Sequence, residues 1–234
     1  LVATVNYRLA PMVSLPSQLV DCKRALAWVR RHAHEHGGDG QRLVVGGESA
    51  GGHLASVMAL TANDPSLQPG FEGDDTQVLA CVDLYGVHDL LDSNDAIKEK
   101  DPKKGFQQYL ERLVMKRRRV DDPEAFKAAS PHHLVLRRAA GVLDGDAGDN
   151  LATIPPFLCV HGTNDTLVPI ADMQHFVEAV CGLRVFRSQA TGSRMNNAVA
   201  DVYIETEGGH HAFNFVPSAR TLALGDAVLD FCNH

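Results

Sequence analysis

A serine, an aspartate and a histidine, the three residue types that together can catalyse acyl transfer, are spread along this chain, each after an apolar run. Residues 46–52 read GGESAGG, directly after the apolar residues 43–45, and contain the pattern G-x-S-x-G around Ser49. In that pattern the serine lies on a tight corner between a strand and a helix, and small neighbours let nearby backbone pass close. The competing interpretation is a glycine-rich turn with a structural serine. The apolar run before the motif and the small-residue segment after it favour the reactive serine.

A serine hydroxyl becomes nucleophilic only when a base accepts its proton and a carboxylate orients that base. Asp165 follows the apolar residues 157–161, and the pair His210 and His211 follows the apolar residues 199–204. Because the carboxyl ends of parallel strands meet at one sheet edge, we expect these side chains to lie near Ser49. Asp172, on a predicted helix, is the weaker alternative for the acid. The choice between His210 and His211 stays open at this point.

The segments that must position these residues alternate between strand-like and helix-like patterns. Apolar, β-branched runs predict strands, and apolar residues with helical spacing predict helices. The predicted strands are Leu1–Asn6, Leu43–Val45, Val78–Tyr85, Phe157–His161 and Val199–Ile204, and the predicted helices are Leu15–His36, Ala50–Ala62, Ile170–Cys181 and Ser218–Phe231. This alternation predicts an α/β fold with a mostly parallel sheet and helices on both faces.

The length of 234 residues is typical of one domain, so we expect residues 1–234 to form a single unit. The alternation is interrupted between residues 87 and 153, where a charged helical stretch precedes a glycine- and aspartate-rich one. We interpret residues 87–153 as an inserted cap or lid over the sheet edge. Residues 187–198 are expected to form a second flexible loop.

The composition excludes several classes of protein. The net charge of −7 argues against a nucleic-acid binder, and the one basic cluster, residues 116–119, is expected to be a solvated helix face. The sequence contains no apolar run long enough to span a membrane.

The five cysteines are odd in number and unclustered, so we expect buried free thiols and a cytoplasmic location. His32 and His36 could face one way, but without a third ligand we expect no metal site, and Trp28 is expected in the core.

Four motifs in order resemble one family. They are YRLAP at residues 7–11, GGESAGG at 46–52, HGTNDTLVP at 161–169 and HAF at 211–213. Together they resemble the hormone-sensitive-lipase-like carboxylesterases of the α/β-hydrolase fold (fold-3), over nearly the whole chain outside the two loops. The resemblance implies Ser49 as the nucleophile, Asp165 as the acid and His211 as the base. It favours His211 over His210 because the family's base usually stands two residues before an aromatic residue, as His211 does before Phe213.

The family resemblance also implies how the reaction is supported. The backbone N–H of Ala50 would supply one oxyanion-hole donor, and no metal or organic cofactor is needed. The family's other donors lie on a His-Gly-Gly-Gly-type loop upstream of YRLAP, so we expect an N-terminally truncated hydrolase domain whose first strands are missing and whose activity is impaired. The expected reaction is hydrolysis of short- to medium-chain acyl esters, small-molecule substrates, through an acyl-serine intermediate. An arylformamidase, a serine peptidase, a non-catalytic hydrolase-like binding domain and assembly as a homo-oligomer remain open alternatives.

Overall fold

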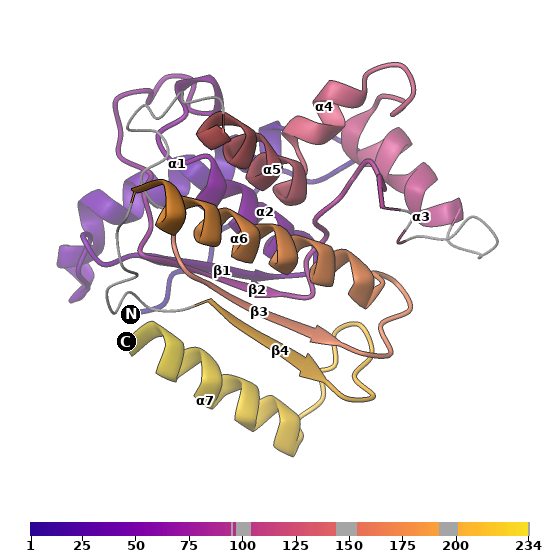
Figure 1. Ribbon diagram of the computed structural model, residues 1–234. Coiled ribbons are helices and arrows are strands. Elements are labelled where there is room, and N and C mark those ends of the chain that lie inside the picture. The colour runs from indigo at the N-terminus through magenta and orange to yellow at the C-terminus, as the bar shows by residue number, and fades with distance from the viewer. Residues whose placement is uncertain (95, 97–103, 144–153, 192–200, 234) are drawn as a thin grey trace.

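The computed structural model describes residues 1–94, 96, 104–143, 154–191 and 201–233 of the chain (Figure 1). Helices and strands alternate along most of this length. The elements are α1 Ser17–His32, η1 Ala33–His36, β1 Val44–Glu48, α2 Ala50–Leu60, η2 Pro65–Leu67, β2 Ala80–Leu84, α3 Lys104–Tyr109, η3 Leu110–Met115, α4 Pro123–Ala128, α5 Pro131–Leu143, β3 Phe157–Gly162, α6 Ile170–Thr191, β4 Val202–Thr206 and α7 Ala219–Asn233. In this part of the chain no helix is long and apolar enough to cross a membrane.

The four strands of the described residues form one parallel sheet in the order β1-β2-β3-β4. Strands that follow each other in the sequence are therefore neighbours in the sheet, and each returns through a helical connection. Four of the five predicted strands are present with shifted ends. Because all strands run the same way, their carboxyl ends share one edge, and the predicted α/β fold class is confirmed.

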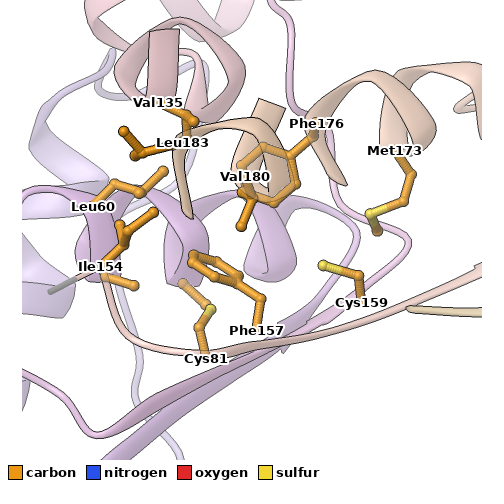
Figure 2. Close-up of a cluster of buried hydrophobic side chains, with 12 residues drawn as sticks. Leu60, Cys81, Val135, Ile154, Phe157, Cys159, Met173, Phe176, Val180 and Leu183 are labelled. Carbon is orange, nitrogen blue, oxygen red and sulfur yellow. The ribbon is translucent and has the colours of Figure 1, made fainter. Parts of the chain in front are cut away.

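Alternate residues of the strands face two helical layers. Cys81 of β2 and Phe157 and Cys159 of β3 pack against α2 and α6, whereas Val82 and Leu158 pack on the other face against α7. Figure 1 shows α2, α5 and α6 on one side of the sheet and α7 on the other, and Figure 2 shows the first of these apolar clusters. Burial of both faces explains why every residue of the central strands β2 and β3 is buried and why most of these residues are apolar.

The predicted inserted region, residues 87–153, contains the short elements α3, η3 and α4 and the longer helix α5. Phe126 of α4 and Leu110 and Met115 of η3 form a small apolar cluster with Val87 and Leu90, which immediately follow β2. Helix α5 packs against α2 and α6. Residues 144–153, which include the predicted aspartate-rich loop, lie outside the described residues. The assignment of 87–153 as a cap within a single domain stays a prediction.

The basic cluster at residues 116–119 is exposed as predicted, but it occupies a turn after η3 rather than a helix face. Three of its side chains form ion pairs with nearby carboxylates. These pairs are Arg117 with Asp122, Arg118 with Asp121 and Arg119 with Glu111.

The prediction of a buried strand at Leu1–Asn6 is wrong. These residues have no regular secondary structure, and the side chains of Leu1 and Val2 are 77 % and 89 % exposed. A β-branched apolar run becomes a strand only when a neighbouring strand completes its hydrogen bonds, and the four-stranded sheet of the described residues does not include this segment.

Two other burial predictions also fail. Trp28 is 48 % exposed on α1, where its ring stacks on that of His32 instead of entering the core. Cys22, Cys81 and Cys159 are buried thiols as predicted, but Cys181 is exposed and Cys232 is half-buried.

Helix α6 continues to Thr191, beyond its predicted end at Cys181. Residues 187–191 of the second predicted loop therefore belong to this helix, and residues 192–198 lie outside the described residues. The predicted end lies just before Gly182, a residue type common directly after a helix, but here the helix continues through it.

Candidate active site

Ser49 lies on the corner between β1 and α2 with a strained backbone. Its φ and ψ angles are 53° and −117°, a region that a residue with a side chain rarely occupies. The N–H of Ser49 donates to the carbonyl of Leu84 at 2.9 Å, which fixes the corner to the end of β2. A Cβ at Gly47 would lie 2.3 Å from the carbonyl carbon of Gly51, so the corner requires glycine at position 47. A Cβ at Gly51 would meet nothing within 4 Å, so its glycine is not required by close approach.

A chain of hydrogen bonds joins the three residues that the sequence singled out. Ser49 Oγ lies 2.8 Å from Nε2 of His211, and Nδ1 of His211 lies 2.7 Å from Oδ2 of Asp165. The carboxylate accepts at Nδ1, so the neutral imidazole carries its proton there and presents the Nε2 lone pair to the serine hydroxyl. The side chain of His211 is 18 % exposed, whereas that of Asp165 is completely buried.

Asp165 is held by several donors besides His211. Its Oδ1 accepts from the N–H groups of Leu167 and Val168 at 2.9 Å each, and Nε2 of His161 lies 3.2 Å from its Oδ2. Burial alone would raise the pKa of this carboxyl group. The hydrogen bonds from His161, His211 and the Val168 N–H outweigh burial and hold the pKa of Asp165 well below its usual range. The residue is therefore ionised at neutral pH.

The loops that carry the aspartate and the histidine are hydrogen-bonded to each other. The N–H of Thr163 donates to the carbonyl of Thr206 at 3.1 Å, and that of Asn164 donates to the carbonyl of Gly209 at 2.9 Å. A Cβ at Gly162 would lie 2.2 Å from the Gly209 carbonyl oxygen, so the glycine allows the two backbones to approach. This contact continues the β3–β4 pairing beyond the sheet edge and fixes the separation of acid and base.

The alternative residues lie elsewhere. Nδ1 of the exposed His210 lies 3.1 Å from the carbonyl oxygen of Asn164, so this ring belongs to the loop contact rather than to Ser49. The carboxylate of Asp172, the weaker candidate for the acid, instead accepts from Nδ1 of His88 at 3.0 Å.

Sequence reasoning missed a second network beside the serine. Nδ2 of Asn214 donates to Oε1 of Glu48 at 2.5 Å, and the hydroxyl of Tyr85 donates to Oδ1 of Asn214 at 2.6 Å. The Tyr85 ring is almost fully buried and lies edge-on to the ring of His211, with 5.0 Å between centroids. Glu48 lies inside the serine motif and Asn214 three positions after His211, so proximity to the motifs is the sequence signal that could have identified two of the three.

A third network, which sequence reasoning also missed, is buried beneath the Ser49 corner between β2, α2 and α6. His88 is completely buried and lies between two carboxylates, with Nε2 3.0 Å from Asp83 Oδ2 and Nδ1 3.0 Å from Asp172 Oδ2. Ser56 of α2 donates to the same Asp83 oxygen. Burial lowers the pKa of His88, but the charges and hydrogen bonds of Asp83 and Asp172 outweigh burial and raise it to about 9. The histidine is therefore an imidazolium at neutral pH.

The first turn of α2 and a nearby cavity complete the surroundings. Ala50 is the first residue of α2 and is exposed, so its N–H is free of helical pairing and lies at the positive end of the helix dipole. A mainly apolar cavity of about 190 Å³ lies along α2 one turn further on. Its lining includes Leu15, Leu19, His53, Leu54, Val57 and Met115. None of the side chains of Ser49, His211 and Asp165 lines it.

Within the described ranges, no group of three or more histidine, cysteine or acidic side chains is arranged to hold a metal ion.

Comparison with known families and proteins places these features in context. Residues 1–180 match the BD-FAE family. The chain is 37 % identical over 228 residues to the esterase LipQ of Mycobacterium tuberculosis (strain ATCC 25618 / H37Rv), covering 97 % of this chain and 46 % of LipQ. It is 38 % identical over 227 residues to the probable carboxylic ester hydrolase LipM of the same organism, covering 97 % of this chain and 45 % of LipM. The chain thus spans about half the length of these relatives.

Solved structures are also similar. The butyrate-bound esterase Est2 of the Planctomycetes species Thermogutta terrifontis is 27 % identical, with a TM-score of 0.60 over 93 % of this chain and 66 % of Est2. A truncated carbohydrate esterase from gut microbiota has a TM-score of 0.66 at 20 % identity, covering 99 % of this chain and 74 % of that protein, a likeness of fold alone.

Proposed function

Because the chain belongs to the BD-FAE family of α/β-hydrolases, we propose that it acts as a serine carboxylesterase on short- to medium-chain acyl esters. The observation that carries this proposal is the continuous hydrogen-bond chain from Ser49 Oγ through both ring nitrogens of His211 to Asp165. The esterase names of LipQ and LipM support the same reaction class.

In the proposed reaction Ser49 Oγ attacks the ester carbonyl carbon while Nε2 of His211 accepts its proton. Ionised Asp165 holds the ring orientation and stabilises the imidazolium that forms. The N–H of Ala50, at the start of α2, donates to the oxygen that becomes negative. His211 then returns the proton to the leaving alcohol, which leaves an acyl-serine. Water attacks this acyl group with His211 again acting as the base. The bond to Ser49 Oγ breaks, the carboxylic acid leaves, and His211 returns the proton to the serine.

Two observations support a short acyl group in this proposal. The apolar cavity of about 190 Å³ lies along the face of α2 that begins at Ala50, since residues 50, 53, 54 and 57 share one helical face. Its volume suits a short aliphatic chain rather than a long one. The structure of the relative Est2 was determined with butyrate, a four-carbon acid.

The first test is hydrolysis of p-nitrophenyl butyrate by the wild-type chain beside Ser49→Ala. We expect turnover that falls to the background rate in the variant, because the hydroxyl that forms the acyl-enzyme is absent. Ser66→Ala, which changes an exposed serine, is the matched control and should keep the wild-type rate.

Covalent labelling by a fluorophosphonate separates catalysis from binding. The reagent requires an activated serine, so we expect Ser49 to be modified in the wild type and no labelling in Ser49→Ala. A folded wild-type chain that neither turns over the ester nor takes the label would contradict the proposal and favour a non-catalytic binding role.

A further inference from the structure

We propose that Asn214 is a positioning residue that holds the His211 turn against the serine corner through Glu48 and Tyr85. This inference rests on the proposed function. It adds a role for three residues outside the Ser49–His211–Asp165 chain, and it follows from where their hydrogen bonds are made.

The Asn214 amide joins the ends of two strands. Glu48 is the last residue of β1 and precedes Ser49, and Tyr85 follows the last residue of β2. Asn214 donates to Glu48 at 2.5 Å and accepts from the Tyr85 hydroxyl at 2.6 Å. The amide suits both bonds, because its NH₂ group donates to the carboxylate on one side while its oxygen accepts the hydroxyl proton on the other.

The turn that Asn214 anchors is the one that carries His211. Ala212, the next residue, has a φ of +58°, a left-handed conformation that alanine adopts only when its surroundings impose it. The N–H of Phe215 donates to the Ala212 carbonyl at 3.0 Å, which closes the turn around Asn214. The fixed amide therefore determines where the strained turn lies relative to β1.

Tyr85 carries the constraint to the imidazole itself. Its own φ is +45°, and its N–H donates to the carbonyl of Val160 at 2.8 Å, so its backbone is fixed between β2 and β3. Its ring lies edge-on to His211 at 5.0 Å and to Phe213 at 5.7 Å. The hydroxyl bond to Asn214 prevents the ring from turning, so the His211 ring packs against a fixed surface.

Exchanging the carboxylate of Glu48 and the amide of Asn214, first singly and then together, tests this role. Asn214→Asp keeps the shape but places two carboxylates in contact, which repel and displace the turn. We expect kcat for p-nitrophenyl butyrate to fall about 100-fold with KM nearly unchanged, since a misplacement of about 1 Å costs this much. Adding Glu48→Gln restores a donor opposite the new carboxylate, so the double variant should recover to within about fivefold of wild type.

Two further variants make the result specific. Glu48→Gln alone should cost much less than Asn214→Asp, because the new amide oxygen still accepts from Asn214. Asn6→Asp, at an exposed position in the N-terminal segment, adds the same charge elsewhere and should keep the wild-type kcat.

Recovery in the double variant supports the proposal. Equal kcat in wild type and Asn214→Asp, or a double variant as slow as Asn214→Asp, would overturn it. If Asn214→Asp fails to fold, Tyr85→Phe, which removes only the hydroxyl, replaces it and should also lower kcat at constant KM; an unchanged kcat would overturn the proposal. A wild type with neither turnover nor fluorophosphonate labelling would overturn the proposed function, whereas an active wild type that is insensitive to these changes would overturn only the positioning role.

Discussion

Two of the histidines that lie beside aspartate carboxylates, His211 and His88, have very different surroundings. His211 contacts one carboxylate and the Ser49 hydroxyl, and its side chain is 18 % exposed at the carboxyl edge of the sheet. His88 contacts two carboxylates, is completely buried and stacks on Phe176 with 4.5 Å between ring centroids. Both assemblies contain histidine, aspartate and serine, but only in the first does a ring nitrogen face a serine hydroxyl.

The difference shows that the partner of the second ring nitrogen decides whether a histidine can act as a base. At His211 one nitrogen is fixed by Asp165 and the other can accept a proton, as general-base catalysis requires. At His88 both nitrogens donate to carboxylates, so the ring is held as a cation and has no free lone pair. The buried assembly instead links β2, α2 and α6 behind the serine corner, through Asp83, Ser56 and Asp172.

The largest expected effect comes from a change at His211, which should abolish activity without unfolding the protein. His211→Gln removes the proposed base, so we expect kcat to fall roughly 10⁴-fold or more, while the melting temperature changes little. Ester hydrolysis and thermal denaturation measure the two quantities. His210→Gln is the matched control next in sequence and should retain activity within about twofold, because its ring contacts only a loop carbonyl. Equal losses in both variants would contradict the assignment of His211.

The converse change should unfold the protein rather than inactivate it selectively. His88→Leu leaves the buried carboxylates of Asp83 and Asp172 without their cation, which costs about 3–5 kcal/mol in comparable buried pairs. We expect a large drop in the urea midpoint, measured by circular dichroism. His88→Gln, which retains one donor, should lose less. A His88→Leu variant as stable as wild type would show that the cluster does not hold this charge.

The pH dependence of stability follows from the same cluster. The pKa of His88 is raised to about 9, so its stabilising contribution is complete below the ordinary histidine pKa of ~6.5 and is lost as the pH rises through about 9. The pKa values of Asp83 and Asp165 are lowered, so their contributions are present above pH ~4 and are lost on acidification. Urea denaturation between pH 5 and 9.5 should show a decline on the alkaline side, on the order of a few kcal/mol. Lys23, whose pKa is lowered to about 8 by burial, changes stability in the opposite direction over this range, so the decline is measured as the difference between wild type and His88→Gln. The same alkaline limb in both proteins would argue against a charged His88.

The smallest expected effect concerns two adjacent glycines, one near each assembly. A Cβ at Gly51 meets nothing within 4 Å, so Gly51→Ala in the first turn of α2 should be neutral or stabilise by about 0.5–1 kcal/mol. A Cβ at Gly52 would lie 2.6 Å from Oδ1 of Asp83, so Gly52→Ala should destabilise by disturbing the buried cluster. Denaturation midpoints of the two variants measure this contrast. Equal midpoints would show that the cluster yields to a methyl group.

Much of the fold was predictable because it follows from local patterns. Apolar, β-branched runs predicted four of the strands, and the serine corner followed from the residues that flank Ser49. The prediction failed at Leu1–Asn6 and at Trp28 because strand pairing and burial depend on neighbours that a local pattern does not specify. The end of α6 was also missed, because Gly182 follows the predicted end and yet lies inside the helix.

The chemistry available to this protein can be inferred from the order of its residues: a serine after one apolar run, and an acid and a histidine after two later ones. The family resemblance favoured His211 over the adjacent His210, and the folded backbone of the turn between β4 and α7 is what brings the His211 ring to Ser49. Tertiary structure also separated Asp165 from Asp172 and joined Glu48 to Asn214. These contacts link residues up to 166 positions apart, and they form only when the parallel strands bring their carboxyl ends to the same edge.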